Sequence, residues 1–215
     1  SGIAHEIRNP LNSVQGFVQL LQESAPDEEQ SGYCTIVLEE VARINRIVQE
    51  MLDFARDQPY SMDRVDPGAL ARSLVDLLGP EAQGAGLDFG LADLPAELPA
   101  VRGNADRLKQ VLLNLLRNAF QATPSGGRVT FSVTTAADEE TGVPRVRFAV
   151  TDTGCGIPPD AASRIFDPFY TTKDDGTGLG LSICQKIAEQ HAGRLSVQSR
   201  EGEGSTFTLE IPGLA

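Results

Sequence analysis

The first residues of the chain with an evident chemistry are a histidine, a glutamate and an asparagine within five positions. They belong to the run His5-Glu6-Ile7-Arg8-Asn9-Pro10-Leu11. A neutral imidazole nitrogen is a nucleophile, and an adjacent carboxylate can hold or accept the proton of the other ring nitrogen. Pro10 removes one helical hydrogen bond and lets a helix bend below the histidine. The run therefore makes His5 a candidate nucleophile, and a surface histidine without a chemical role is the alternative that the run alone leaves open.

A second candidate is a pair of asparagines, Asn114 and Asn118, on a helix predicted over 105–122. Residues four apart share a helix face, so both amides lie on the side opposite the leucines. Amide oxygens are neutral ligands that suit a Mg²⁺ ion carrying phosphates. An ordinary solvated helix face shows the same pattern, so the spacing alone leaves both interpretations open.

Two glycine-rich segments adjoin predicted elements. Asp152-Thr153-Gly154-Cys155-Gly156-Ile157-Pro158 follows a strand, and its carboxylate can accept a hydrogen bond from an exocyclic amine such as that of adenine. Gly176-Thr177-Gly178-Leu179-Gly180-Leu181 opens a helix, where backbone N–H groups attract anions. The second segment is neither a dinucleotide fingerprint nor a Walker loop. A tight turn that starts at the aspartate is the alternative for the first segment.

Between the glycine segments lies the run Phe166-Asp167-Pro168-Phe169-Tyr170-Thr171-Thr172-Lys173. Its aromatic residues can pin a lid, and Lys173 can reach a phosphate. Plain core packing is the alternative for the two phenylalanines.

The elements that must position these residues fall into two groups. Residues 1–57 repeat apolar side chains at steps of three and four, with a break at Ser24-Ala25-Pro26-Asp27, which predicts an antiparallel two-helix hairpin. Its apolar stripe is too broad for one hairpin to cover. We therefore expect a homodimer through residues 1–57, with a four-helix bundle.

A polar linker is predicted over 58–66, and a second domain over 67–215. Asp66-Pro67 is a helix start, with an N-cap followed by a proline in the first turn. Alternating apolar residues predict strands at 128–136 and 144–152. The remaining expected elements are helices at 67–78, 105–122 and 178–191, a strand at 87–91, and a hairpin of 194–200 with 204–211. The fold class is α+β, with helices on one face of the sheet.

The composition of the chain limits the classes of partner and the cellular compartment that we expect. The formal net charge of −12 argues against a nucleic-acid partner, because phosphate backbones need a basic surface. Three cysteines, Cys34, Cys155 and Cys184, match no disulfide or metal spacing and suggest a reducing compartment. We expect a cytoplasmic protein, attached to a membrane only through parent segments outside this sequence.

In this order and spacing, the motifs closely resemble the transmitter core of bacterial two-component sensor histidine kinases. His5 to Leu11 matches the phosphoacceptor box, Asn114 to Ala119 the asparagine box, Asp152 to Pro158 the first glycine box, Phe166 to Phe169 the phenylalanine box, and Gly176 to Leu181 the second glycine box. The resemblance covers essentially the whole chain. It implies a helical hairpin followed by a Bergerat-type α/β sandwich that binds ATP and Mg²⁺.

The resemblance also implies roles for individual residues. His5 would be the phosphorylated histidine, Glu6 its acid–base neighbour, and Asn9 a residue that orients water against a phosphorylated partner. Asn118 would bind Mg²⁺, and Asp152 would recognise adenine. Nucleotide contacts are expected for Asn114, Asn118, Asp152, Gly154, Gly156, Lys173, Thr177, Gly178, Leu179, Gly180 and Thr206. The partner would be a response-regulator receiver domain, phosphorylated on an aspartate.

Two departures from the family pattern are visible. Gln121 stands where many members have lysine, and Gly103-Asn104-Ala105 where many have Gly-Asp-Pro. The segment from Phe169 to Gly176 is short, as in the branch related to nitrogen-regulation sensors.

Rival functions are a catalytically silent ATP-binding scaffold, a phosphatase-dominant sensor, and an ATPase of the gyrase or chaperone kind. The intact motif residues speak against the scaffold. The gyrase-like ATPases need a carboxylate where this chain has Asn114, and they lack the helical histidine hairpin. Kinase and phosphatase activities share these residues, so the phosphatase alternative stays open.

Overall fold

The computed structural model divides into two compact units, Ser1–Asp57 and Gln58–Ala215. It describes residues 2–24, 27–55, 61–92, 94–95, 97–137, 142–172 and 176–214.

The first unit is a pair of helices, α1 (Gly2–Glu23) and α2 (Glu28–Ala55), which pack against each other. Asp27 caps α2, since its carboxylate accepts the Gln30 N–H at 2.8 Å. A broad set of large apolar side chains stays exposed on the pair, and Phe17 is 70% exposed. The others are Val14, Leu20, Leu21, Tyr33, Ile36, Val37 and Met51.

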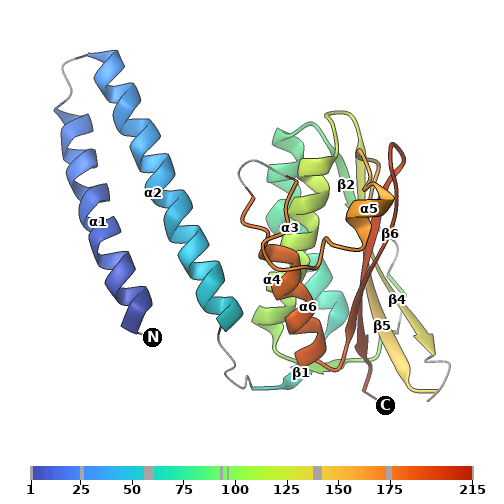
Figure 1. Ribbon diagram of the computed structural model, residues 1–215. Coiled ribbons are helices and arrows are strands. Elements are labelled where there is room, and N and C mark those ends of the chain that lie inside the picture. The colour runs from blue at the N-terminus through green and yellow to red at the C-terminus, as the bar shows by residue number, and fades with distance from the viewer. Residues whose placement is uncertain are drawn as a thin grey trace. The chain divides into compact units, whose positions relative to one another are not determined.

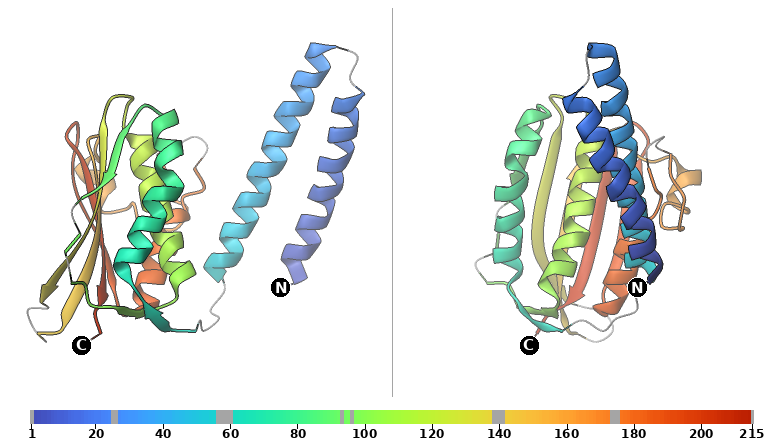
Figure 2. Two further views of the ribbon diagram at one scale, coloured as in Figure 1. Left: turned by 180° about the vertical axis from the view of Figure 1, so that it is seen from behind. Right: turned by 90° about the vertical axis from the view of Figure 1, so that its left-hand side faces the viewer.

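The second unit contains a five-stranded sheet and three long helices, which cover one face of the sheet (Figures 1 and 2). The strand order is β2-β4-β5-β7-β6, and only the β2–β4 pair is parallel. The strands are β2 (Asp88–Leu91), β4 (Arg128–Ala137), β5 (Pro144–Asp152), β6 (Arg194–Arg200) and β7 (Gly204–Pro212). The helices are α3 (Pro67–Gly84), α4 (Ala105–Ala122) and α6 (Gly180–Gln190). The predicted fold class is confirmed.

The core lies between the sheet and these helices. Alternate residues of the central strands face it, so Phe131 on β4 and Phe148 on β5 are fully buried with their rings 6.5 Å apart. The apolar side of α4 closes the core with Leu108, Val111, Leu112, Leu115 and Leu116. The opposite side of α4 is thereby left for polar residues.

Three short elements were not predicted: β1 (Asp63–Val65), β3 (Val101–Gly103) and α5 (Pro159–Ala162). The first two pair antiparallel as a small separate sheet. Helix α3 also runs beyond the predicted end at residue 78 to Gly84, with Pro80 inside it. The helix continues past Pro80 because Leu78 and Ala82 on its last turns are buried in the core.

A buried histidine connects two of the long helices. His191, at the C-terminus of α6, is 4% exposed, and its Nδ1 lies 2.7 Å from the Ile187 carbonyl oxygen. Its Nε2 accepts the N–H of Asn104, the N-cap residue of α4, at 3.0 Å. Burial lowers the pKa of this imidazole, although the hydrogen bond with the Ile187 carbonyl opposes the effect. The ring therefore links α4 and α6 in its neutral form.

Candidate nucleotide site

The two asparagines of the predicted magnesium site are joined on α4. Asn118 Nδ2 donates to Asn114 Oδ1 at 2.9 Å, as expected for amides one turn apart. The start of α6 packs closely against this pair. A Cβ atom on Gly180 would lie 2.6 Å from Asn114 Nδ2, which is closer than real contacts allow. Glycine at this position therefore lets α6 begin directly beside the asparagines.

The beginning of α6 offers backbone donors. Among the described residues, no side chain caps its first turn, and that turn contains no acidic residue. The Leu179 N–H, just before the helix, is 3.2 Å from Thr177 Oγ1. Uncapped N–H groups at a helix N-terminus attract anions, aided by the helix dipole. The arrangement suits the phosphates of a nucleotide beside Asn114 and Asn118.

The approach to α6 is held in a left-handed conformation. Gly178 has φ +68° and Phe169 φ +66°, and the Phe169 N–H donates to the Gly178 carbonyl at 3.0 Å. A Cβ atom on Gly178 would lie 2.4 Å from the Phe169 carbonyl carbon. Positive φ is costly for a phenylalanine, so this contact fixes an unfavourable backbone at the base of the predicted lid. Lys173 lies outside the described residues.

The first glycine motif begins where β5 leaves the sheet. Asp152, the last residue of β5, is 4% exposed, and its Oδ1 accepts the Gly154 N–H at 2.8 Å. Burial raises the pKa of this carboxyl, and the N–H groups of Gly154 and Ser205 oppose the rise. A buried carboxylate with two backbone donors is a strong and oriented acceptor for an amine.

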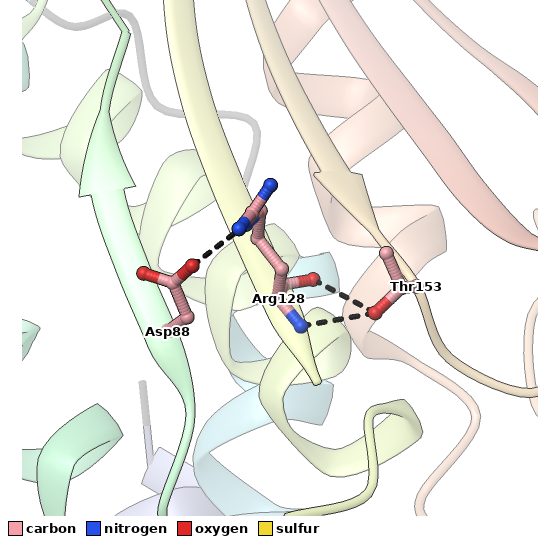
Figure 3. Close-up of polar contacts among 3 residues, drawn as sticks. All are labelled: Asp88, Arg128 and Thr153. Atoms are coloured by element: carbon pink, nitrogen blue, oxygen red, sulfur yellow. Dashed lines mark hydrogen bonds and ion pairs between the residues drawn. The ribbon is translucent and has the colours of Figure 1, made fainter. Parts of the chain in front are cut away.

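Thr153 lets the chain turn away without leaving β4 unpaired (Figure 3). Its N–H donates to the Arg128 carbonyl at 3.1 Å, and its Oγ1 accepts the Arg128 N–H at 2.9 Å. The Thr153 hydroxyl takes the place of a strand carbonyl as acceptor. The hydrogen bonding between β4 and β5 therefore continues one residue beyond their last regular pair, Val129 with Asp152. Arg128 is held in turn by Asp88 of β2, at 2.7 Å from its Nε.

Both glycine motifs meet helix α4. Gly154 packs against the C-terminal end of α4, where an added Cβ would lie 2.4 Å from the Ala122 carbonyl oxygen. The same carbonyl accepts the Cys155 N–H at 3.2 Å. Gly180 approaches Asn114 in the middle of the helix. Helix α4 thus contacts both motifs, the second at Asn114 in its middle and the first at its C-terminal end.

The predicted nucleotide contact Thr206 lies beside the residue that pairs with Asp152. Thr206 on β7 is in register with Thr151, and their hydroxyls are 3.0 Å apart. Ser205 is the residue in register with Asp152. Neighbouring residues of a strand point to opposite faces, so Ser205 shares the face of Asp152 and Thr206 does not, although both line the hollow at the Asp152 end of the sheet. Ser205, which is buried, is the residue of β7 beside Asp152, and the nucleotide contact of Thr206 stays a prediction.

The residues of the phosphoacceptor run lie in α1 by their backbone. The side chains of His5, Glu6 and Asn9 lie outside the described residues. A hollow of about 330 Å³ adjoins the Asp152 end of the sheet and includes Ser199 and Ser205. A larger hollow of about 530 Å³, at the start of α3, contains none of the predicted site residues.

Comparison with known proteins assigns the family. Residues 103–214 match the family model of histidine kinase-, DNA gyrase B- and HSP90-like ATPases, and residues 1–59 match that of the His kinase A phospho-acceptor domain. The chain belongs to the histidine kinase family. It contains the two parts of a histidine kinase transmitter core, as the motif order predicted.

Similar histidine kinases span much more sequence than this chain. It is 37% identical over 212 residues to the signal transduction histidine-protein kinase AtoS of Escherichia coli K12, covering 99% of this chain and 34% of AtoS. It is 38% identical over 213 residues to the sensor histidine kinase ZraS of the same organism, covering 99% and 44%. The chain thus spans between a third and a half of these relatives.

Solved histidine kinase structures show the same fold. Full-length ShkA in complex with AMPPNP matches 100% of this chain and 45% of its own, with a TM-score of 0.84 and 34% identity. ThkA in complex with the response regulator TrrA matches 99% of this chain and 60% of its own, with a TM-score of 0.72 and 32% identity. In the part of this histidine kinase that the structure describes, no helix is long and apolar enough to cross a membrane.

Proposed function

We propose that this kinase core transfers the γ-phosphoryl group of ATP to His5 and then to an aspartate of a response-regulator receiver domain. The observation that carries the proposal is the arrangement around α4. The helix carries two joined amides beside the start of α6, which no side chain caps among the described residues, and its end contacts the loop that follows Asp152. The backbone donors for phosphate at the start of α6 and the acceptor for a purine amine at Asp152 thus both adjoin helix α4.

Each of the two parts of the chain has a separate role in this proposal. We assign dimerisation and the phosphoacceptor to 1–57, a linker to 58–66, and nucleotide binding to 67–215. The exposed apolar side chains of α1 and α2 support a homodimer, because a lone hairpin would leave them in water.

Asp152 would accept the adenine amine, with Ser205 beside it. Gly154 and Gly156 would let the backbone approach the base. At the other end, Gly178, Leu179 and Gly180, with Thr177 and Lys173, would form the phosphate side of the site.

The asparagine pair fits Mg²⁺. The bond from Asn118 Nδ2 to Asn114 fixes the Asn118 amide, whose oxygen is the kind of neutral hard ligand that Mg²⁺ accepts. Mg²⁺ usually takes only one or two protein ligands together with phosphate oxygens, so no cluster of acids is required. When bound, the ion would neutralise charge on the phosphates. We assign Asn118 as its ligand and Asn114 as the residue that orients Asn118.

In the transfer step, a neutral nitrogen of His5 would form a bond to the γ-phosphorus. The bond from that phosphorus to the bridging oxygen breaks, and ADP leaves. Glu6 would accept or stabilise the proton on the other ring nitrogen. We assign to Asn9, one turn later in α1, the orientation of water when the phosphorylated regulator is hydrolysed.

The short segment between Phe169 and Gly176 supports placing the kinase in the branch related to nitrogen-regulation sensors. We propose a cytoplasmic location for this core.

Phosphotransfer tests the proposal. The chain is labelled with γ-labelled ATP and Mg²⁺, freed of nucleotide and mixed with candidate receiver domains. Label should leave the kinase and appear on a cognate receiver, and not on the same receiver with its acceptor aspartate replaced by asparagine. A chain that binds ATP yet acquires no label would contradict the proposed function.

A further inference from the structure

A row of polar side chains crosses three strands at the end of the sheet where the first glycine motif begins. Asp152 on β5 is in register with Ser205 on β7, and Ser205 is in register with Ser199 on β6. Residues in register on antiparallel strands share a face, with their Cβ atoms about 4.5–5.5 Å apart. Ser199 therefore ends the row at the edge of the sheet, two strands from the carboxylate.

The hydroxyl of Ser199 meets three polar groups. It accepts the Ile157 N–H at 2.8 Å, and it lies 2.9 Å from Ser205 Oγ and 3.0 Å from the Gly204 carbonyl oxygen. A hydroxyl has one proton. If Ser199 donates to Gly204, the Ser205 proton completes the bond between the two serines. If Ser199 donates to Ser205, the Ser205 proton is directed elsewhere. Ser199 thereby sets how the Ser205 hydroxyl is presented beside Asp152.

The same hydroxyl also anchors the far end of the loop that follows Asp152. That loop crosses to the β6–β7 hairpin, where the Gly202 N–H donates to the Cys155 carbonyl at 2.7 Å. Gly156, at φ +68°, lies so close to Arg200 that an added Cβ would be 2.0 Å from its carbonyl oxygen. The Ile157 N–H bond to Ser199 comes next. The Ser199 side chain thus bonds both to Ser205, beside Asp152, and to Ile157, in the loop that follows Asp152.

We propose that Ser199 is a positioning residue for purine recognition. It orients the Ser205 hydroxyl and holds Ile157, so that Asp152 and Ser205 meet the base in one arrangement. This inference rests on the proposed function, because it requires ATP beside Asp152. Ser199 acts through Ser205 and the loop, so its loss should affect binding of the base and not transfer of the phosphoryl group.

Ser199→Ala in the full chain tests this. Losing one or two hydrogen bonds should raise the KM and Kd for ATP about three- to tenfold and leave kcat at saturating ATP unchanged. The preference for ATP over GTP should fall as well. Ser199→Thr keeps the hydroxyl on a strand that tolerates β-branched residues, and it should restore both values. Ser196→Ala, on the same strand but the exposed opposite face, is the matched control and should bind normally.

A double-mutant cycle isolates the route of the effect. If Ser199 acts through Ser205 as well as the loop, Ser199→Ala should cost less in the Ser205→Ala background than in the unaltered chain, because only the part that acts through Ile157 remains. Multiplicative losses, a fall in kcat with unchanged KM, or failure of Ser199→Thr to restore binding would overturn the inference. Normal ATP binding by Ser199→Ala would overturn it while leaving the proposed function intact. Failure of the unaltered chain to bind ATP would remove both.

Discussion

The buried imidazole of His191 should make the stability of the nucleotide domain depend on pH. The ring accepts the Asn104 N–H at the start of α4 and contacts the Ile187 carbonyl within α6. Replacing it with alanine leaves the Asn104 N–H without this acceptor and opens space in a buried region. The two effects together should cost about 2–5 kcal/mol of unfolding free energy. Loosening both helices should also weaken ATP binding.

The sign of the pH dependence follows from the lowered pKa of His191. Above pH ~6.5 the ring is neutral in both the folded and the unfolded chain, so its full contribution is present. Below that pH the His191 imidazole binds a proton in the unfolded chain and stays neutral in the folded chain. Stability then falls by up to ~1.4 kcal/mol per pH unit until the folded pKa is reached. Acid should therefore loosen the junction of α4 and α6.

Urea denaturation followed by circular dichroism between pH 5 and 8 measures this effect. The difference in unfolding free energy between the unaltered chain and His191→Ala should be largest above pH 6.5 and shrink toward pH 5. Taking the difference cancels the other titrating groups that both proteins share, including His5. A difference that stays constant with pH, or grows as the pH falls, would refute a neutral buried His191.

Three further variants test separate parts of the structure. Gly180→Ala should push the Asn114 amide away from Asn118. Calorimetry should then show Mg²⁺-dependent ATP binding weakened about three- to tenfold, with little change in Tm. In the control Gly79→Ala, the added Cβ would meet no atom within 4 Å, so ATP binding should be normal. Thr153→Val should lower stability by about 1 kcal/mol, because the Arg128 N–H loses its hydroxyl acceptor, whereas Thr153→Ser should not. Val48→Glu with Met51→Glu should convert a dimer into a monomer in sedimentation, and an unaltered chain that is monomeric at micromolar concentration would contradict the dimer.

Long periodic elements were predictable from the sequence. Helix α4 was expected over 105–122 and is observed over Ala105–Ala122, because its leucines repeat at helical spacing and Asn104 caps its start. The strands β4 and β5 were also expected within one residue of their ends. In contrast, β1 and β3 have three residues each, too few to show a period of two.

The details that the sequence did not show depend on register and on distant contacts. Thr206 was the contact predicted on β7, whereas Ser205 is the residue in register with Asp152, and on a strand one residue changes the face. His191 was missed because its acceptor role involves Asn104, 87 positions away. Ser199 was missed for a similar reason, since its partners are Ile157 and the β6–β7 hairpin. Motifs indicate which residues carry chemistry, but local spacing does not show what orients them.

The most direct test of the central claim is labelling of His5 itself. The unaltered chain and His5→Gln are incubated with γ-labelled ATP and Mg²⁺, and ATP binding is measured in parallel. The unaltered chain should acquire a label that is lost in acid and retained in base, as expected of an N–P bond. His5→Gln should bind ATP with unchanged affinity and acquire no label. Equal labelling of His5→Gln, or a label that survives acid, would contradict phosphoryl transfer to this histidine.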